Sequence, residues 1–519
     1  MILRQLGLMF SSLVMSVAIV SCSSTDTLLV KTRDGMVRGT MEEGVMAFKG
    51  IPYARIERFR APLPVEPWDT VMICDHYGPQ VMQNTGRELP DSLMSEKGSA
   101  VLNVWTKDVK GKMPVMLWIH GGGFDSGSGS GNPGYGLAAQ DVVSVSLNHR
   151  LNILGFLDLS RFSDKYADSA NAGMLDIVAA LQWIKDNISK FGGDPGNVTI
   201  FGESGGGGKV GTLMCMPVAK GLFHKAIIMS GTILNVNDKQ MTEELGNAVL
   251  EELGITPDRV DEILDVTYRE LYDAGQRAMV RSIGRRTPGT PMMWGFGPVP
   301  DGKTLLQQPF QDDLADMSAD IPLMMGTTFN ELQKTVYSQG AISFEEAEEQ
   351  LNPVFAPYTG ELTDAFKEAY PDMEAADLVS MDRMFRPKTL ITADAIASSW
   401  KAPFYTYMFA WKSPVSNASV HGDELAFCFN TLDIVPRQIP SPTEQDRYLA
   451  ALMSSAWVNF AKTGNPNVDG LPRWTEYKED GSIMYFNYTC QLRHNPDRKI
   501  QDIMNKCCFK QLDKFKASK

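Results

Sequence analysis

Short apolar runs alternate with turns and a helical stretch in the first half of the chain. Residues 114–120 (PVMLWIH) and 141–147 (DVVSVSL) are rich in β-branched and aromatic side chains, which predicts two buried strands. Residues 173 to about 190 carry apolar side chains at helical spacing. A glycine turn at 192–195 follows, and then the strand-like run 198–201. Strand, helix and strand in this order imply parallel pairing, so the pattern predicts an α/β fold class with a mostly parallel sheet.

The run 198–201 leads directly into GESGG at 202–206, which matches the pattern G-x-S-x-G. A serine at a tight strand-to-helix turn is strained and keeps its hydroxyl exposed, as in the nucleophile elbow of α/β-hydrolases. We therefore predict Ser204 as a nucleophile, with the N–H group of Gly205 beside it. Because four glycines precede Lys209, a phosphate-binding loop is the alternative, but the spacing does not fit G-x-x-x-x-G-K-[ST].

A second glycine cluster, at 121–123, follows the predicted strand 114–120. Glycine has no Cβ, so the chain can turn several backbone N–H groups toward one point. Such N–H groups can bind the oxyanion that forms when a nucleophile attacks a carbonyl. A plain glycine-rich turn is the alternative for this stretch taken alone.

A serine hydroxyl needs a base. The chain has six histidines: His76, His120, His149, His224, His421 and His494. In α/β-hydrolases the chain order is serine, acid, histidine, which excludes the three that precede the serine. His224 follows the serine too closely to leave room for an acid, and His494 lies among surface-type residues. His421 follows a strand-like run at 404–411 in a polar loop, and we predict it as the base.

The acid should follow a strand between the serine and the histidine, where it can orient the imidazole and stabilise its protonated form. Residues 321–326 (IPLMMG) predict such a strand, and Glu331 follows it, so we predict Glu331 as the acid. A loop glutamate that faces solvent is the alternative. Asp423 and Glu424 are nearer to the histidine in sequence, but such close neighbours rarely fold back onto the ring.

The N-terminus carries an export signal. Arg4 gives a positive start, and the apolar residues 6–20 are too few and too interrupted for a membrane span. The segment ends in IVSC, which resembles a bacterial lipobox, whose cysteine is acylated and becomes the new N-terminus. We expect residues 1–21 to be the lipoprotein signal peptide and Cys22 to anchor the protein in a membrane, the outer one in preference to the inner one because Ser23 follows. An ordinary signal peptide that happens to contain a cysteine is the alternative.

The composition is that of one large globular domain. The chain has 519 residues, 43% of them hydrophobic, and neither a repeat nor a linker divides residues 22–519. The net charge of −13 argues against nucleic-acid binding. The seven cysteines match no zinc pattern, and we expect no metal. Export would permit a disulfide from Cys490 to Cys507 or Cys508.

Together these residues resemble the type-B carboxylesterase family, which includes carboxylesterases, cholinesterases and bile-salt-activated lipases. The resemblance covers nearly the whole chain after the export signal. It rests on GMVRG at 35–39, GIPYA at 50–54, LNVW at 102–105, HGGGF at 120–124, NHRL at 148–151, FGGDP at 191–195, HGDEL at 421–425 and WVNFAKTGNP at 457–466. It implies an α/β-hydrolase fold with helices on both faces of the sheet, helical insertions over about 235–400, and a serine esterase that needs no cofactor and acts on a small-molecule ester.

The resemblance also implies roles for individual residues. These are the triad Ser204, Glu331 and His421, the oxyanion donors Gly122, Gly123 and Gly205, and two neighbours of the triad, Glu203 and Ser230. The sequence departs from the family at two places. Val81 and either Ser99 or Gly98 stand where the family usually has a disulfide, and Gly205 replaces the usual alanine but still supplies an N–H group.

Other functions use the same scaffold. They are those of an amidase, an acyltransferase and an adhesion-type relative that has lost its nucleophile. Because nucleophile, acid, base and oxyanion glycines are all present, the sequence favours an ester hydrolase that forms an acyl-enzyme on Ser204. The natural ester and the oligomeric state are not predicted by any pattern in the chain.

Overall fold

The computed structural model describes residues 26–84, 93–283, 295–309, 317–332, 341–435 and 438–508. The predicted signal peptide and Cys22 lie outside these residues. The described residues form a large sheet with the strand order β14-β13-β12-β11-β10-β9-β7-β8-β6-β4-β3 and a small sheet with the order β1-β2-β5.

The strands are β1 (Leu29–Lys31), β2 (Met36–Arg38), β3 (Thr40–Glu42), β4 (Val45–Pro52), β5 (Val71–Ile73), β6 (Val101–Thr106), β7 (Met113–Ile119), β8 (Val143–Leu147), β9 (Gly193–Glu203), β10 (Lys225–Met229), β11 (Leu323–Thr328), β12 (Phe404–Phe409), β13 (Ser482–Phe486) and β14 (Gln491–His494). The helices are α1 (Tyr135–Ala138), α2 (Asn152–Phe156), α3 (Ala172–Asn187), α4 (Gly205–Met214), α5 (Lys239–Leu253), α6 (Tyr268–Ile283), α8 (Phe344–Phe355), α9 (Thr359–Ala369), α10 (Ala375–Ser380), α11 (Phe385–Ala397), α12 (Leu425–Cys428), α13 (Glu444–Thr463), α14 (Tyr477–Asp480) and α15 (Arg498–Cys508).

The middle of the large sheet is parallel, as the sequence predicts. Strands β8, β7, β9, β10, β11, β12 and β13 pair in parallel, and antiparallel strands lie toward both edges. One strand is longer than predicted, because β9 begins at Gly193 rather than at residue 198. Gly192 makes the preceding turn with a φ of 78°, and Gly193 already pairs with Met113 of β7.

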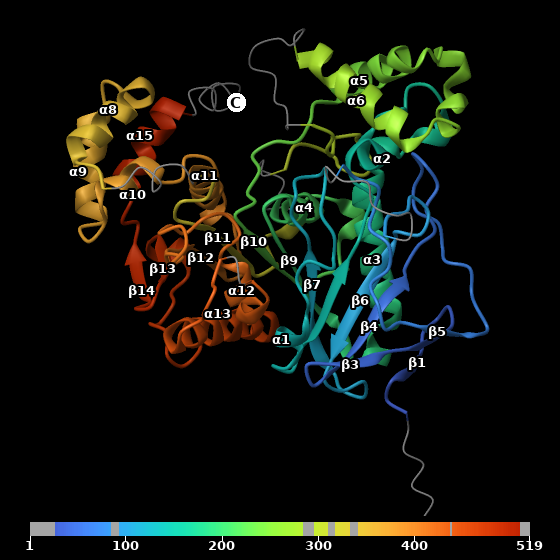
Figure 1. Cartoon of the computed structure of the whole chain (residues 1–519), viewed down its shortest axis with the longest axis horizontal. Coiled ribbons are helices and arrows are strands. Elements are labelled where there is room, and N and C mark those ends of the chain that lie inside the picture. Colours follow the sequence, from blue (N-terminus) through green and yellow to red (C-terminus); the bar gives the residue numbers. More distant parts are fainter. Residues whose placement is uncertain are drawn as a thin grey trace, which may run out of the picture.

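Both faces of the large sheet are buried, which explains why its strands are continuous apolar runs. In β7, Val115, Leu117 and Ile119 pack into one hydrophobic cluster, whereas Met116 and Trp118 pack into another. The first cluster includes side chains of α3 and the second includes side chains of α13. Helices therefore cover both faces of the sheet (Figure 1), which confirms the predicted α/β-hydrolase architecture.

Two groups of helices lie on opposite sides of the molecule in Figure 1. Helices α5 and α6 pack together at the upper right, and α8, α9, α10 and α15 gather at the upper left. All of these helices except α15 fall within the helical insertions expected over about 235–400. The C-terminal helix α15 joins the second group by packing on α8 and α9.

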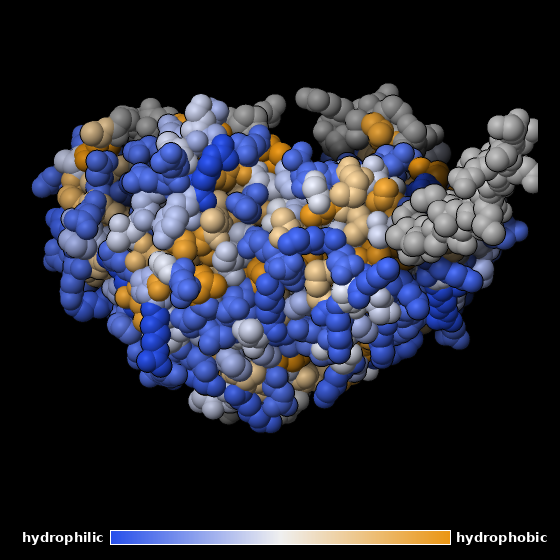
Figure 2. All heavy atoms as spheres, turned by 90° about the horizontal axis from the view of Figure 1, so that it is seen from below, coloured by the Kyte–Doolittle hydropathy of each residue, from blue (hydrophilic) through white to orange (hydrophobic). Residues whose placement is uncertain are grey.

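The surface shown in Figure 2 is largely hydrophilic, with hydrophobic side chains scattered over it. Within the part of the chain that the structure describes, no helix has the length and apolar character needed to cross a membrane.

Cys490, Cys507 and Cys508 are free thiols, so the structure does not contain the disulfide considered between Cys490 and Cys507 or Cys508. Cys490 packs against the hydrophobic cluster that contains α13, whereas Cys507 packs against the cluster of α8 and α9. The two thiols therefore belong to different parts of the core.

Candidate active site

Five neighbouring parallel strands bring the predicted site residues to one edge of the large sheet. In spatial order these strands are β12, β11, β10, β9 and β7. His421 lies in the segment after β12, Glu331 after β11, Ser230 after β10, Ser204 after β9 and the glycine loop (residues 121–123) after β7. The carboxyl ends of parallel strands share an edge, which is where open α/β sheets bind their ligands.

Ser204 occupies a strained turn between β9 and α4. Its φ of 57° and ψ of −126° lie outside the regions that non-glycine residues prefer, which costs on the order of 1–3 kcal/mol. Its N–H group donates to the carbonyl oxygen of Met229 at 2.9 Å, which ties the turn to β10. A Cβ atom on Gly206 would lie only 2.1 Å from the carbonyl oxygen of Ile119, so glycine is required where α4 passes β7. The G-x-S-x-G segment thus has the predicted elbow conformation.

The glycine loop lies against the start of α4, beside Ser204. Gly122 and Gly123 have φ values of 86° and 63°, and both are exposed. A Cβ atom on Gly205 would lie 2.2 Å from the carbonyl oxygen of Gly123. The three predicted oxyanion donors are therefore close neighbours, and the approach is tighter than the family's usual alanine at position 205 would permit in this backbone.

Lys209 does not face solvent, as a phosphate-binding lysine would. Its side chain is fully buried, and Nζ donates to the carbonyl oxygens of His120 at 3.0 Å and Gly123 at 2.7 Å. Both acceptors belong to the segment that carries the glycine loop. The four glycines before Lys209 therefore do not form a phosphate-binding loop with this lysine.

Glu331 and His421 meet through both backbone and side chain. The backbone N–H group of His421 donates to the carbonyl oxygen of Glu331 at 3.0 Å, and Nδ1 of His421 contacts Oε2 of Glu331. The other carboxylate oxygen, Oε1, accepts a hydrogen bond from the N–H group of Thr328 at 2.7 Å. Glu331 is fully buried, so the alternative of a glutamate that faces solvent is wrong.

The second ring nitrogen of His421 is directed at Glu203. Nε2 lies 3.1 Å from Oε1 of Glu203, the residue that precedes Ser204. The imidazole is therefore held between two carboxyl groups, one on each nitrogen. A positive charge on the ring would be stabilised from both sides.

The fifth strand end, that of β10, contributes Ser230 and, through it, Glu424. Ser230 is fully buried with a φ of 45°, and its hydroxyl donates to Oε1 of Glu424 at 3.3 Å. Glu424 does not take the position on Nδ1 of the imidazole, which Glu331 occupies.

Burial dominates the electrostatics of these carboxyl groups. It raises the pKa of Glu203 and of Glu331 well above the ordinary value, with repulsion from Glu424 adding to the first and from Asp382 to the second. Burial and the neighbouring Glu331 raise the pKa of Glu424 to about 8. The acids cannot all be ionised at neutral pH, so the site holds protons as well as charges.

Two residues near the imidazole were not predicted from the sequence. The ring of Phe385 stacks on that of His421, with centroids 4.8 Å apart and planes at 17°. Asp382 is buried and accepts from the N–H groups of Met384 at 2.9 Å and Phe385 at 2.8 Å, so it fixes the start of α11 and with it Phe385. An aspartate shortly before a helical run is a capping signal, but the stacking has no signature in a single sequence.

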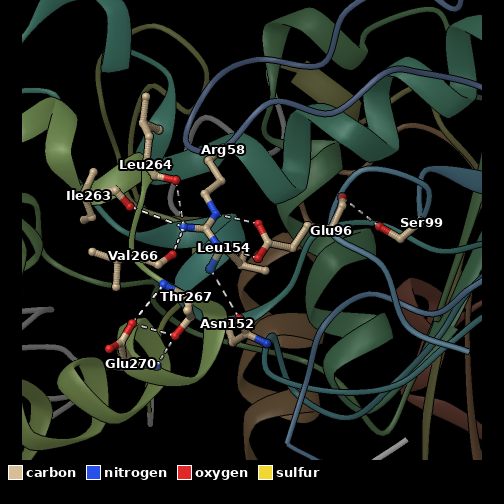
Figure 3. Close-up of polar contacts among 10 residues, drawn as sticks. All are labelled: Arg58, Glu96, Ser99, Asn152, Leu154, Ile263, Leu264, Val266, Thr267 and Glu270. Atoms are coloured by element: carbon tan, nitrogen blue, oxygen red, sulfur yellow. Dashed lines mark hydrogen bonds and ion pairs between the residues drawn. The ribbon is translucent and has the colours of Figure 1, made fainter. Parts of the chain in front are cut away.

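An ion pair tethers the segment where the family usually has a disulfide (Figure 3). Arg58 contacts both carboxylate oxygens of Glu96 at 2.5 Å, and its Nη1 donates to the carbonyl oxygen of Val266 at 2.5 Å. Nearer the start of the same segment, the amide of Gln83 exchanges two hydrogen bonds with the backbone of Gly127, at 2.7 and 2.9 Å. Polar contacts thus attach this segment to the residues that follow the glycine loop.

A cavity of about 350 Å³ opens beside Asp125, two residues beyond Gly123. Its walls come mainly from α5 and α6 and are mostly apolar, including Met241, Leu245 and Met279. The lining of this cavity suits an uncharged group. Among the described residues, no three His, Cys, Asp or Glu side chains are grouped so as to hold a metal ion.

Comparisons with known proteins show the family of this chain. The model of the carboxylesterase family matches residues 26–504. The para-nitrobenzyl esterase of Bacillus subtilis is 36% identical over 87% of this chain and 93% of its own length, and the liver carboxylesterase of Sus scrofa is 31% identical over 89% and 90%.

A solved esterase from the anaerobe Clostridium hathewayi, described as able to hydrolyse aliphatic aromatic polyesters, has a TM-score of 0.82. It is 36% identical and covers 92% of this chain and 98% of its own. The family model, the relatives and the solved structure all indicate an esterase. The chain therefore belongs to the carboxylesterase family and is a serine carboxylic-ester hydrolase.

Proposed function

We propose that Ser204 is the nucleophile of this esterase, His421 its general base and Glu331 the acid that orients the base. The observation that carries the proposal is the strained Ser204 at the end of β9, with the Glu331–His421 pair presented by β11 and β12 at the same edge of the sheet. A strained, partly exposed serine next to a buried acid–imidazole pair is the arrangement that activates a hydroxyl for acyl transfer.

In the acylation step, His421 Nε2 takes the proton of Ser204 as Oγ attacks the ester carbonyl. During this step Nδ1 keeps its contact with Glu331. The oxyanion receives hydrogen bonds from the N–H groups of Gly122, Gly123 and Gly205. His421 then protonates the departing alcohol. In deacylation His421 takes a proton from water, which attacks the acyl carbonyl, and returns this proton to Ser204 Oγ as it leaves.

The proposed substrates are esters in which at least one side is uncharged and apolar or aromatic. The mostly apolar cavity beside Asp125 would receive that group. The names of the para-nitrobenzyl esterase and of the polyester-hydrolysing esterase indicate aromatic esters for those relatives. An amidase or an acyltransferase would use the same groups, and product analysis with an added alcohol acceptor separates acyl transfer from hydrolysis.

We further propose that the enzyme is exported and anchored by a lipid on Cys22, in the outer membrane rather than the inner one. The support is the sequence alone: a positive start, a short apolar stretch and IVSC at its end. One large domain, residues 22–519, would then be displayed on a short polar tether.

The experiment that tests the nucleophile is Ser204→Ala. We expect hydrolysis of p-nitrophenyl butyrate to fall by about 10⁴- to 10⁶-fold and labelling by a fluorophosphonate probe to disappear, because no other residue replaces the attacking oxygen. The Ser441→Ala variant, at an exposed position, is not expected to change either readout. Labelling of the Ser204→Ala protein at another serine, with activity retained, would overturn the assignment.

A further inference from the structure

A buried lysine lies behind the glycine loop, outside the proposed triad. Lys209 is fully buried in α4, one helical turn after Gly205. Its Nζ donates to the carbonyl oxygens of His120 and Gly123 and lies 5.3 Å from the centre of the Phe124 ring. Among the described residues, no carboxylate oxygen lies within 4.0 Å of this ammonium group. Burying a cation without a carboxylate is costly, so its contacts with the loop call for an explanation.

The two carbonyl groups that Lys209 holds are the two ends of the glycine loop. The carbonyl groups between them are held as well: that of Gly121 accepts from Nδ1 of His120 at 2.9 Å, and that of Gly122 accepts from the N–H group of Ser126 at 3.0 Å. In a trans peptide the N–H group points opposite to the carbonyl group of the preceding residue. The carbonyl groups of Gly121 and Gly122 therefore set the direction of the N–H groups of Gly122 and Gly123, and Lys209 anchors the peptide groups on either side of them.

Glycine makes this external support necessary. Gly122 and Gly123 have positive φ, and without side chains they have no steric preference that would keep one loop conformation. Gly205 completes the fit, because a Cβ atom there would lie 2.2 Å from the carbonyl oxygen that Lys209 binds. Lys209 and Gly205, which has no Cβ, thus both allow the glycine loop to pack closely against α4.

We propose that Lys209 is a positioning residue: it holds the glycine loop against α4 and thereby aims the N–H groups of Gly122 and Gly123 at the oxyanion. This inference rests on the proposed oxyanion roles of those glycines. Lys209 touches no reacting atom, so it should affect the transition state, which carries the oxyanion, and not the binding of the neutral ester.

The test compares Lys209→Met, which keeps the length of the side chain but removes its donors, with Lys209→Gln, which keeps a neutral donor. Lys225→Met is the matched control. Lys225, the first residue of β10, is also largely buried, but its Nζ bonds the side chain of Asn197 on β9 and not the glycine loop. We expect Lys209→Met to lower kcat for p-nitrophenyl butyrate by about 10- to 100-fold with KM nearly unchanged, less than the full loss of one donor. Lys209→Gln should recover part of this, and Lys225→Met should leave kcat unchanged.

A second readout separates aiming from general stability. A trifluoromethyl ketone, whose adduct on the serine carries an oxyanion, should bind Lys209→Met more weakly by the same factor by which kcat/KM falls. Gly205→Ala should lower kcat in the wild-type background and have a smaller effect beside Lys209→Met, because the loop is then no longer held against position 205.

Failure of the inference on Lys209 can be distinguished from failure of the proposal that Ser204 is the nucleophile. Activity that survives Ser204→Ala would overturn the proposed function whatever Lys209 does. If Ser204→Ala is inactive, a folded Lys209→Met protein with wild-type kcat and ketone affinity would overturn the inference alone, as would a change confined to KM. Failure of both Lys209 variants to fold would show a purely structural residue and would also reject it.

Discussion

His421 and Glu331 are joined twice, once by a backbone hydrogen bond of 3.0 Å and once between Nδ1 and the carboxylate. The backbone bond belongs to a bridge in which Glu331 pairs with Val420 as neighbouring strands would. Because the backbone sets the distance between the two segments, the side-chain contact does not depend on the carboxylate alone. This makes it feasible to change the charge of the acid without losing the position of the base.

We predict that Glu331→Gln lowers kcat by about 10³- to 10⁴-fold with little change in KM. The amide keeps the shape and the backbone bridge but does not stabilise the imidazolium that forms during acylation. Steady-state kinetics with p-nitrophenyl butyrate measures the effect. Glu349→Gln, at an exposed position on α8, is the control and should behave as wild type. A variant that retains more than a tenth of wild-type kcat would contradict the role of Glu331.

Much of this site could be predicted because each of its main parts adjoins a strand. The apolar runs before Ser204 and Glu331 are strong signals, and parallel pairing then brings their ends together. The order of serine, acid and histidine selected His421 without any structure. Each of these signals can be found in a short stretch of sequence. They can be combined because parallel strands end at the same edge of a sheet and because the triad has a fixed order along the chain.

The remaining parts depend on contacts between distant segments. The stacking of Phe385 on His421 and the bonds from Lys209 to the glycine loop require knowledge of which helix packs on which loop. The sequence pattern predicts the start of β9 five residues too late, because Gly192 alone makes the turn before the strand. The thiols considered for a disulfide lie in separate hydrophobic clusters, which no spacing of cysteines could reveal.

We predict that the buried carboxyl group of Glu424 makes the folding stability depend on pH. Burial raises its pKa to about 8 from the ordinary 4.5. Between these two values the folded protein keeps a proton that the unfolded chain has released, so folding stability falls as the pH rises from about 5 to 8. Glu424→Gln carries no titrating proton and should lose this contribution.

Thermal unfolding at pH 5.5 and pH 8.5 measures the effect. We expect the drop in Tm between the two values to be smaller in Glu424→Gln than in wild type by roughly 2–4 °C. Glu349→Gln should keep the wild-type difference. An unchanged difference in Glu424→Gln would show that Glu424 titrates near the ordinary value for a glutamate.

The lipid anchor on Cys22 is testable by fractionation. Without the cysteine there is no thiol to acylate, so we expect Cys22→Ala to move the enzyme from the membrane fraction to the soluble fraction with its kcat unchanged. Cys508→Ala, which removes an exposed thiol on α15, should stay in the membrane fraction. The same distribution for Cys22→Ala and wild type would contradict the anchor.

The ion pair of Arg58 and Glu96 should stabilise the fold in the place of the family's disulfide. Both side chains are mostly buried, at 16% and 21% exposure, and the guanidinium also donates to the carbonyl oxygen of Val266. Glu96→Gln would leave this cation half-satisfied inside the protein, so we expect a loss of about 1–3 kcal/mol, between the values for exposed and buried pairs. The pair of Arg55 and Glu66 lies nearby at 52% and 80% exposure and offers a matched comparison.

Glu66→Gln should therefore change the unfolding free energy by less than about 0.5 kcal/mol. Urea denaturation of both variants supplies the comparison, and Arg58→Met combined with Glu96→Gln should be more stable than Glu96→Gln alone, because no unpaired cation then remains. If Glu96→Gln lost no more stability than Glu66→Gln, the segment that ends at Ser99 would be held by its other contacts, such as those of Gln83 with Gly127. The response of kcat would then distinguish the two contacts, since Gln83 bonds Gly127, which follows the glycine loop, whereas Arg58 bonds Glu96 and Val266.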